Sequence, residues 1–175
     1  MAIKLNNGCV KMQLPNGKVV DILTTVLDEI FAWLQNDQYK PESGGYIIGY
    51  QHKDTGNIVL EMVSTPHELD EKSLIRFDIK DPQHNLLLRL AQRKKSYYMG
   101  VWHTHPQDIP TPSSIDWEDW KQTLAVDKTG CEYIFFIIAG TAGTRVWVGN
   151  KNENSITEIE ECIKKDGLYE NRNHN

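Results

Sequence analysis

The alternation of apolar and polar residues along the chain predicts short strands interleaved with helices. Residues 10–14 and 18–22 alternate around a Pro-Asn-Gly turn, which is typical of a β-hairpin. After Thr25, a candidate capping residue, the apolar spacing changes to every three or four positions, as on one face of a helix. Two apolar runs, 44–51 and 57–63, are joined by a polar turn and predict a second hairpin.

The middle of the chain predicts a helix followed by a buried strand. Residues 64–80 are polar and mixed, with a short extended candidate at 74–79. Asp81 as the capping residue and Pro82 as the first helical residue predict a helix start. The backbone N–H at the first helical position has no partner within the helix, so proline, which lacks this group, loses no hydrogen bond there. The apolar run 97–102 follows and predicts a buried strand.

The last third predicts another strand pair and a final helix. Apolar runs at 132–139 and 144–149 flank a Gly-Thr-Ala-Gly turn. Ser155 and Glu158 have the spacing of a capping box, and three isoleucines at helical spacing continue toward Gly167. We therefore predict a helix between these ends that packs on the sheet.

Together these elements predict an α/β fold, a mixed β-sheet flanked by helices. With 175 residues the chain is about one domain long, and we expect a single domain at 1–167. The polar residues 168–175 predict a flexible C-terminal tail.

Composition narrows the classes of function. A net charge of -5 argues against a nucleic-acid partner, because phosphate binding needs clustered Lys and Arg. No apolar run approaches the ~20 residues of a membrane helix. The first residues lack the apolar core of a signal peptide, so we expect a cytoplasmic protein. The three cysteines show no Cys-x-x-Cys pairing and support no disulfide framework.

Candidate metal chemistry gathers directly after the 97–102 strand. His103 and His105 share one face of an extended chain, because side chains alternate in a strand. Ser113 begins a Ser-x-x-Asp step before an apolar-periodic run, which predicts a helix with Asp116 in its first turn. Two imidazoles and one carboxylate leave the fourth position of a tetrahedral zinc site open, as in catalytic sites.

Each part of this pattern also has an ordinary structural interpretation. Paired histidines occur as polar residues where a strand meets a loop. Ser113 with Asp116 fits a helix capping box. The combination is more specific than either part.

The pattern resembles the JAMM signature of the JAB/MPN metalloproteases. It is carried by His103, His105, Ser113 and Asp116, together with Glu42 ahead of the Gly-rich run at 44–49. The resemblance spans residues 20–149 and implies a three-layer, cytidine-deaminase-like fold. It also implies one Zn2+ per chain held by His103, His105 and Asp116.

The same resemblance implies roles for the two remaining residues. Glu42 is expected to act as the general acid-base beside the metal and not as a ligand. For Ser113, a hydrogen bond to the oxyanion and helix capping both stay open, and one residue can do both.

For function, the resemblance implies hydrolysis of an amide bond after a ubiquitin-like or conjugated protein tail. Small bacterial JAB proteins of this length resemble the deconjugating peptidases of CBASS-type anti-phage operons. Two other classes stay open, a catalytically silent MPN scaffold and a RadC-like DNA-repair protein. Scaffolds characteristically lose the ligands, whereas RadC-like proteins bring a helix-hairpin-helix region and a basic face, which this sequence lacks.

The protein substrate is expected to present an extended C-terminal tail. Such a tail can add to a sheet edge as an extra strand. The segment 64–80 is the candidate receiver, and proline at Ile75 or Phe77 would remove a backbone donor from it. The alternative is an ordinary connecting loop. The sequence carries no indication of oligomeric state.

Overall fold

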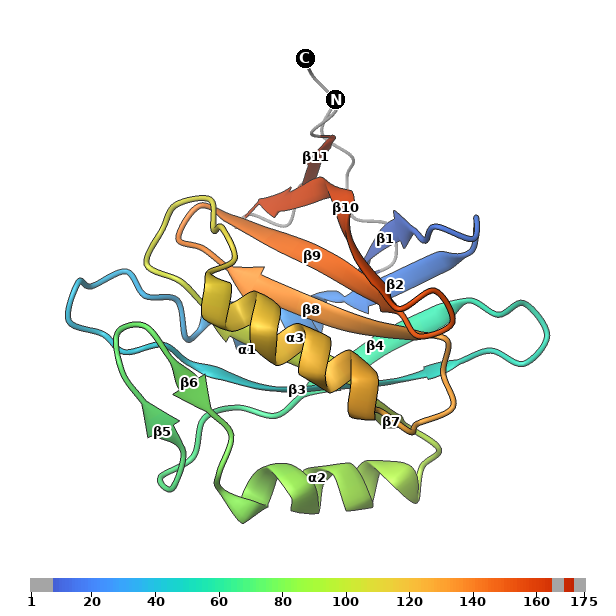
Figure 1. The fold of residues 1–175 in the computed structure, drawn as a ribbon, viewed down its shortest axis with the longest axis horizontal. Helices are drawn as coiled ribbons and strands as arrows, with labels where there is room; N and C mark the ends of the chain where they lie inside the picture. The colour runs from blue at the N-terminus through green and yellow to red at the C-terminus, as the bar shows by residue number, and fades with distance from the viewer. Residues whose placement is uncertain (1–7, 165–168, 172–175) are drawn as a thin grey trace.

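The fold is built on one curled, mixed β-sheet (Figure 1). The computed structural model describes residues 8–164 and 169–171. The order of strands in the sheet is β1-β2-β4-β3-β7-β8-β9-β10-β11. Only the β2–β4 and β7–β8 pairs are parallel among these neighbours. The sheet strands are β1 (Cys9–Gln13), β2 (Val19–Leu23), β3 (Gly44–Gln51), β4 (Ile58–Val63), β7 (Tyr97–Thr104), β8 (Tyr133–Ala139), β9 (Gly143–Asn150), β10 (Ser155–Lys164) and β11 (Tyr169–Asn171).

Helices cover both faces of the curled sheet. Helix α1 (Thr24–Phe31) buries Val26, Leu27 and Ile30 in the main core against inward-facing residues of the strands. Helix α3 (Ser114–Val126) packs Trp120 and Leu124 on the other face, against β8 and β9. Helix α2 (Pro82–Gln92) lies beside β3 and β7. The predicted sheet with flanking helices is therefore confirmed (Figure 1).

A short second hairpin leaves the main sheet between β4 and α2. Its strands are β5 (Glu71–Lys72) and β6 (Phe77–Asp78), so the extended candidate at 74–79 contains one short strand. Asp81 caps α2 by accepting the Gln83 N–H at 2.9 Å, as the sequence predicts.

The predicted cap of α1 is wrong. The helix begins at Thr24 with Leu23 as the capping residue, and no side chain accepts a hydrogen bond there. The chain passes directly from β2 into α1, so the strand leaves no room for Thr25 to lie outside the first turn. The Thr24 hydroxyl instead donates to the Gly8 carbonyl at 2.8 Å.

The helix predicted from Ser155 onward is also wrong, because Ser155–Lys164 is strand β10. This strand pairs with β9, and its register shifts at a bulge after Glu158. Ile156 packs with the outer cluster beside α3, whereas Ile159 and Ile163 lie in the main core. The bulge thus gives the isoleucines a three- and four-residue spacing that imitates a helix.

Tyr169–Asn171 forms a strand, where the sequence predicted a flexible tail. It pairs with β10 in antiparallel register. Gly167, the predicted helix end, and the rest of 168–175 lie outside the described residues. No helix in the described ranges is long and apolar enough to cross a membrane.

Gly100 lets β7 lie tightly against β8. Its φ is 137°, and a Cβ there would lie 1.8 Å from the Phe135 carbonyl oxygen. The β3–β7 register shifts at this point, so the alternation of side chains restarts after the glycine. Val101 therefore packs on the α3 side, and His103, two residues later, shares that face.

Candidate metal centre

The two histidines lie at the carboxyl end of β7, as predicted. His103 pairs with Gly44 of β3, and the His105 N–H donates to the Ala139 carbonyl at 3.0 Å. Their ring Nε2 atoms are 3.1 Å apart. The backbone of two neighbouring strands thus brings both imidazoles to one point.

Asp116 reaches the same point from the first turn of α3. One of its oxygens is 3.1 Å from His103 Nε2, and the other is 3.2 Å from His105 Nε2. Ser113 caps the helix, because its hydroxyl accepts the Asp116 N–H at 3.1 Å. The capping box is therefore confirmed, and it holds the carboxylate against the histidines.

The spacing of these donor atoms fits zinc. Ligand atoms about 2.0 Å from a tetrahedral zinc ion lie roughly 3.3 Å from one another. The two Nε2 atoms are 3.1 Å apart, and each faces a different oxygen of Asp116, at 3.1 Å from His103 and 3.2 Å from His105. Two imidazole nitrogens and a carboxylate are also the donor set that zinc prefers. These three residues are therefore able to form one face of a zinc site.

Glu42 lies beside this face and is almost fully buried. Its Oε1 is 3.5 Å from His105 Nε2, and it lies with both histidines in a group whose donor atoms are within 4.8 Å of one another. Its own N–H donates to the Ser73 carbonyl at 2.8 Å. Glu42 is thus close enough either to bind a metal directly or to receive a proton from a water beside it.

The surroundings shift the pKa values of Glu42, Asp116 and His105 in different directions. Burial raises the pKa of Glu42 to about 7, against the opposing effect of His103 and His105. Burial also works against ionisation of Asp116, but hydrogen bonds to the two histidines hold its pKa well below the usual range. For His105, burial acts to lower the pKa, and the bond to Asp116 outweighs it and raises the pKa. Glu42 is thus the carboxyl poised to exchange a proton near neutral pH.

A buried hydrogen-bond chain behind the histidines was not foreseen from the sequence. The Thr104 hydroxyl, between the two histidines but on the opposite face, donates to Gln35 Oε1 at 2.9 Å and accepts the Ser43 N–H at 3.0 Å. The Thr104 N–H donates to the Ser43 carbonyl at 2.9 Å. These hydrogen bonds fix Ser43, and with it Glu42, beside β7. No local spacing joins positions 35, 43 and 104.

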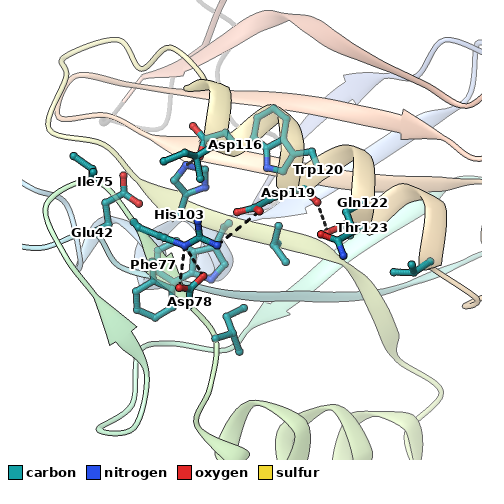
Figure 2. Close-up of a pocket in the computed structure, with 16 residues that line it drawn as sticks. Glu42, Ile75, Phe77, Asp78, His103, Asp116, Asp119, Trp120, Gln122 and Thr123 are labelled. Carbon is teal, nitrogen blue, oxygen red and sulfur yellow. Dashed lines mark hydrogen bonds and ion pairs between the residues drawn. The ribbon is translucent and has the colours of Figure 1, made fainter.

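A groove of about 320 Å³ opens beside the candidate centre, between β6 and α3. Figure 2 shows Glu42, His103 and Asp116 at one end, with Ile75 beside Glu42. Arg76 of the hairpin binds Asp78 at 2.9 Å and reaches to 3.9 Å from Asp119 of α3.

Known proteins are similar to this chain over most of its length. Residues 23–154 match the family model described as prokaryotic homologs of the JAB domain. A CD-NTase/cGAS isopeptidase of Escherichia coli (strain TW11681) is 28% identical over 143 residues, covering 80% of this chain and 86% of that protein. The corresponding isopeptidase of Vibrio cholerae is 28% identical over 142 residues, covering 79% and 86%.

The fold is also found in solved structures, for example the following one. Protein DSY2949 from Desulfitobacterium hafniense superposes with a TM-score of 0.53 at 23% sequence identity. The match covers 78% of this chain and 87% of that one. At this identity the likeness concerns the fold.

Proposed function

Because this chain belongs to the family of prokaryotic JAB-domain proteins, we propose that it is a zinc-dependent isopeptidase. The observation that carries the proposal is that the two imidazole Nε2 atoms and the Asp116 carboxylate lie within 3.2 Å of one another, with the buried Glu42 beside them. A catalytically silent MPN scaffold does not need these residues, because binding to other proteins requires neither metal ligands nor a buried general base.

His103, His105 and Asp116 would hold the zinc ion. When bound, zinc lowers the pKa of a water molecule to about 7 and polarises a carbonyl group. Glu42 accepts the proton of the attacking water and passes it to the leaving lysine nitrogen. Burial disfavours the ionised form of the Glu42 carboxylate and raises its pKa, so this group takes up a proton more readily than an exposed glutamate does. The Ser113 hydroxyl, whose oxygen accepts the Asp116 N–H, would donate a hydrogen bond to the carbonyl oxygen as negative charge develops on it.

The names of the relatives and the position of the groove support a proposal for the substrate class. The two relatives above are named as isopeptidases of CD-NTase/cGAS, so the proposed substrate is a CD-NTase joined through its C-terminal tail to a lysine. The groove between β6 and α3 would receive that tail in extended form. A role in a CBASS-type anti-phage system is the corresponding biological proposal.

The test is cleavage of a defined conjugate. A CD-NTase linked by an isopeptide bond to a lysine of a second protein is incubated with the purified chain and zinc, and products are read by intact mass. We expect release of both proteins with an unmodified tail and an unmodified lysine. Glu42→Gln should show no product on the same time scale, and a zinc chelator should stop the wild type. A wild-type chain that holds zinc and leaves the conjugate intact would contradict the proposed activity.

A further inference from the structure

The side chain of Gln107 lies against the ring of His105 on the side away from His103 and Asp116. Gln107 Oε1 is 3.2 Å from His105 Nδ1. The same oxygen accepts the backbone N–H of Thr111 at 2.8 Å. One amide oxygen therefore contacts both the imidazole and the loop that leads to α3.

These two contacts decide which ring nitrogen of His105 carries a hydrogen. A backbone N–H can only donate, so the Gln107 atom that faces Thr111 must be the amide oxygen and not the NH2 group. That oxygen can only accept, so His105 Nδ1 must be the donor. In the neutral ring, Nε2 then keeps the lone pair, and Nε2 is the atom that faces His103 and Asp116.

The surrounding turn holds Gln107 in place. Its carbonyl accepts the Thr141 N–H at 2.9 Å, in the turn between β8 and β9. Gly140 lies so close that a Cβ there would be 2.6 Å from the Gln107 carbonyl oxygen. Farther along the loop, Arg145 donates to the Pro110 carbonyl at 2.7 Å and pairs with Glu158. The backbone that carries the Gln107 side chain is thus held against the turn between β8 and β9, although the loop lies at the surface.

We infer that Gln107 is a positioning residue that sets the Nδ1–H tautomer and the ring orientation of His105 for metal binding. The inference rests on the proposed function, since it assigns Gln107 a task at the same centre. Such partners of a ligating histidine typically change metal affinity 10- to 100-fold when they are removed. Gln107 does not touch the substrate groove, so it is not a catalytic residue.

The test compares two substitutions of Gln107 by zinc affinity and by NMR. Gln107→Leu removes the acceptor, whereas Gln107→Glu keeps it. Competition with a zinc chelator should show about 10- to 100-fold weaker binding for the Leu variant and no loss for the Glu variant. The 15N shifts of zinc-loaded wild type should show His105 protonated at Nδ1. Gln92→Leu, at the exposed end of α2, is the matched control and should bind zinc like wild type.

The possible failures are distinguishable. Wild-type protein that binds no zinc would overturn the proposed function itself. Wild type that binds zinc, with a Leu variant that binds it equally tightly, would overturn only the role of Gln107. A Glu variant as weak as the Leu variant, with both folded by circular dichroism, would also overturn it, because the shared defect would then come from the loop and not from the acceptor.

Discussion

Ser113 and Asp116 each accept a backbone hydrogen bond from the other. The Ser113 hydroxyl accepts the Asp116 N–H at 3.1 Å, and the Asp116 carboxylate accepts the Ser113 N–H at 2.7 Å. In this arrangement the Ser113 oxygen acts as an acceptor and its hydroxyl hydrogen has no part in the cap. Capping therefore does not compete with donation to a substrate oxygen.

The first prediction separates these two tasks of Ser113. Ser113→Asp should restore an N-cap but place a negative charge where an oxyanion forms, so it should melt near wild type and be inactive. Ser113→Ala should lose about 1 kcal/mol of stability and also about 100-fold in kcat. Ser114→Ala, one residue into the helix and exposed, is the control. Normal turnover in both Ser113 variants would reduce Ser113 to a cap.

The second prediction concerns metal content. Purified protein should contain about one zinc per chain, and His103→Ala or His105→Ala should release it, because two remaining ligands do not keep a tight tetrahedral site. Elemental analysis after dialysis measures the ratio. His52→Ala, in the exposed turn between β3 and β4, should keep its zinc. Stoichiometric zinc in the double alanine variant of His103 and His105 would disprove the ligand assignment.

The sequence predicts the sheet, its helices and most strand positions because those segments have simple periodicity. It fails at β10, where the bulge after Glu158 spaces Ile159 and Ile163 like helical residues. The bulge arises from the pairing of β10 with β9, and the local sequence pattern of β10 contains no information about β9. The cap of α1 fails for a related reason, since the end of β2 determines where the helix begins.

Within the site, the sequence predicts the residues of the motif but not their supports. His103 and Asp116 are recognisable because their residue types and spacing are unusual. Gln107 and Thr104 are ordinary polar residues, and their importance depends on contacts with His105 and Gln35. Only the folded geometry shows those contacts.

The third prediction separates binding from chemistry at Glu42. Glu42→Gln should keep zinc and the fold, because the buried amide has nearly the same shape, but lose about 100-fold or more in kcat. Zinc is measured by elemental analysis and kcat on the conjugate. Loss of zinc together with activity would make Glu42 a ligand, which its 3.5 Å distance from His105 Nε2 also allows. Unchanged turnover would remove it from the mechanism.

The fourth prediction concerns Asp70, whose carboxylate holds the segment between β4 and α2. It accepts the Lys80 and Asp81 N–H groups at 2.9 Å each and lies 2.7 Å from Nε2 of the buried His84. Burial acts to raise the pKa of Asp70, but the hydrogen bonds from Asp81 and His84 outweigh it and lower the pKa. The native state therefore favours the ionised carboxylate more than the unfolded chain does.

The sign of the pH dependence follows. With a lowered native pKa, the stabilisation is fully present above the unfolded pKa of about 3.9 and is lost as pH falls through the native value. Asp70→Asn should lower the free energy of unfolding by on the order of 3 kcal/mol at pH 7. The difference in this free energy between the variant and wild type should shrink below about pH 4. Urea unfolding at several pH values measures both. Asp54→Asn, in an exposed turn, is the control, and a gap that stays constant with pH would contradict the assignment.

The last prediction concerns the strand edge that would receive the substrate tail. Ser73 N–H donates to the Arg76 carbonyl at 2.9 Å, so this pair is hydrogen-bonded across the hairpin. Pairs alternate in an antiparallel ladder, and the next pair, Lys72 with Phe77, is therefore the non-bonded kind. The Phe77 N–H therefore points away from β5. Phe77 lies on β6, the strand that lines the groove together with α3. Ile75 is a weaker test site, because its N–H contacts the Ser73 hydroxyl within the turn.

Phe77→Pro should remove the outward donor and leave the β5–β6 bonds intact. Since one lost hydrogen bond is worth about 1 kcal/mol, we expect KM for the conjugate to rise about fivefold to tenfold with zinc retained. Phe77 also packs over Gly44, so Phe77→Leu is needed to isolate the loss of the ring. The difference in KM between the Pro and Leu variants then measures the backbone contribution. Equal KM values in these two folded variants would place tail binding elsewhere, because the N–H is the group that only proline removes.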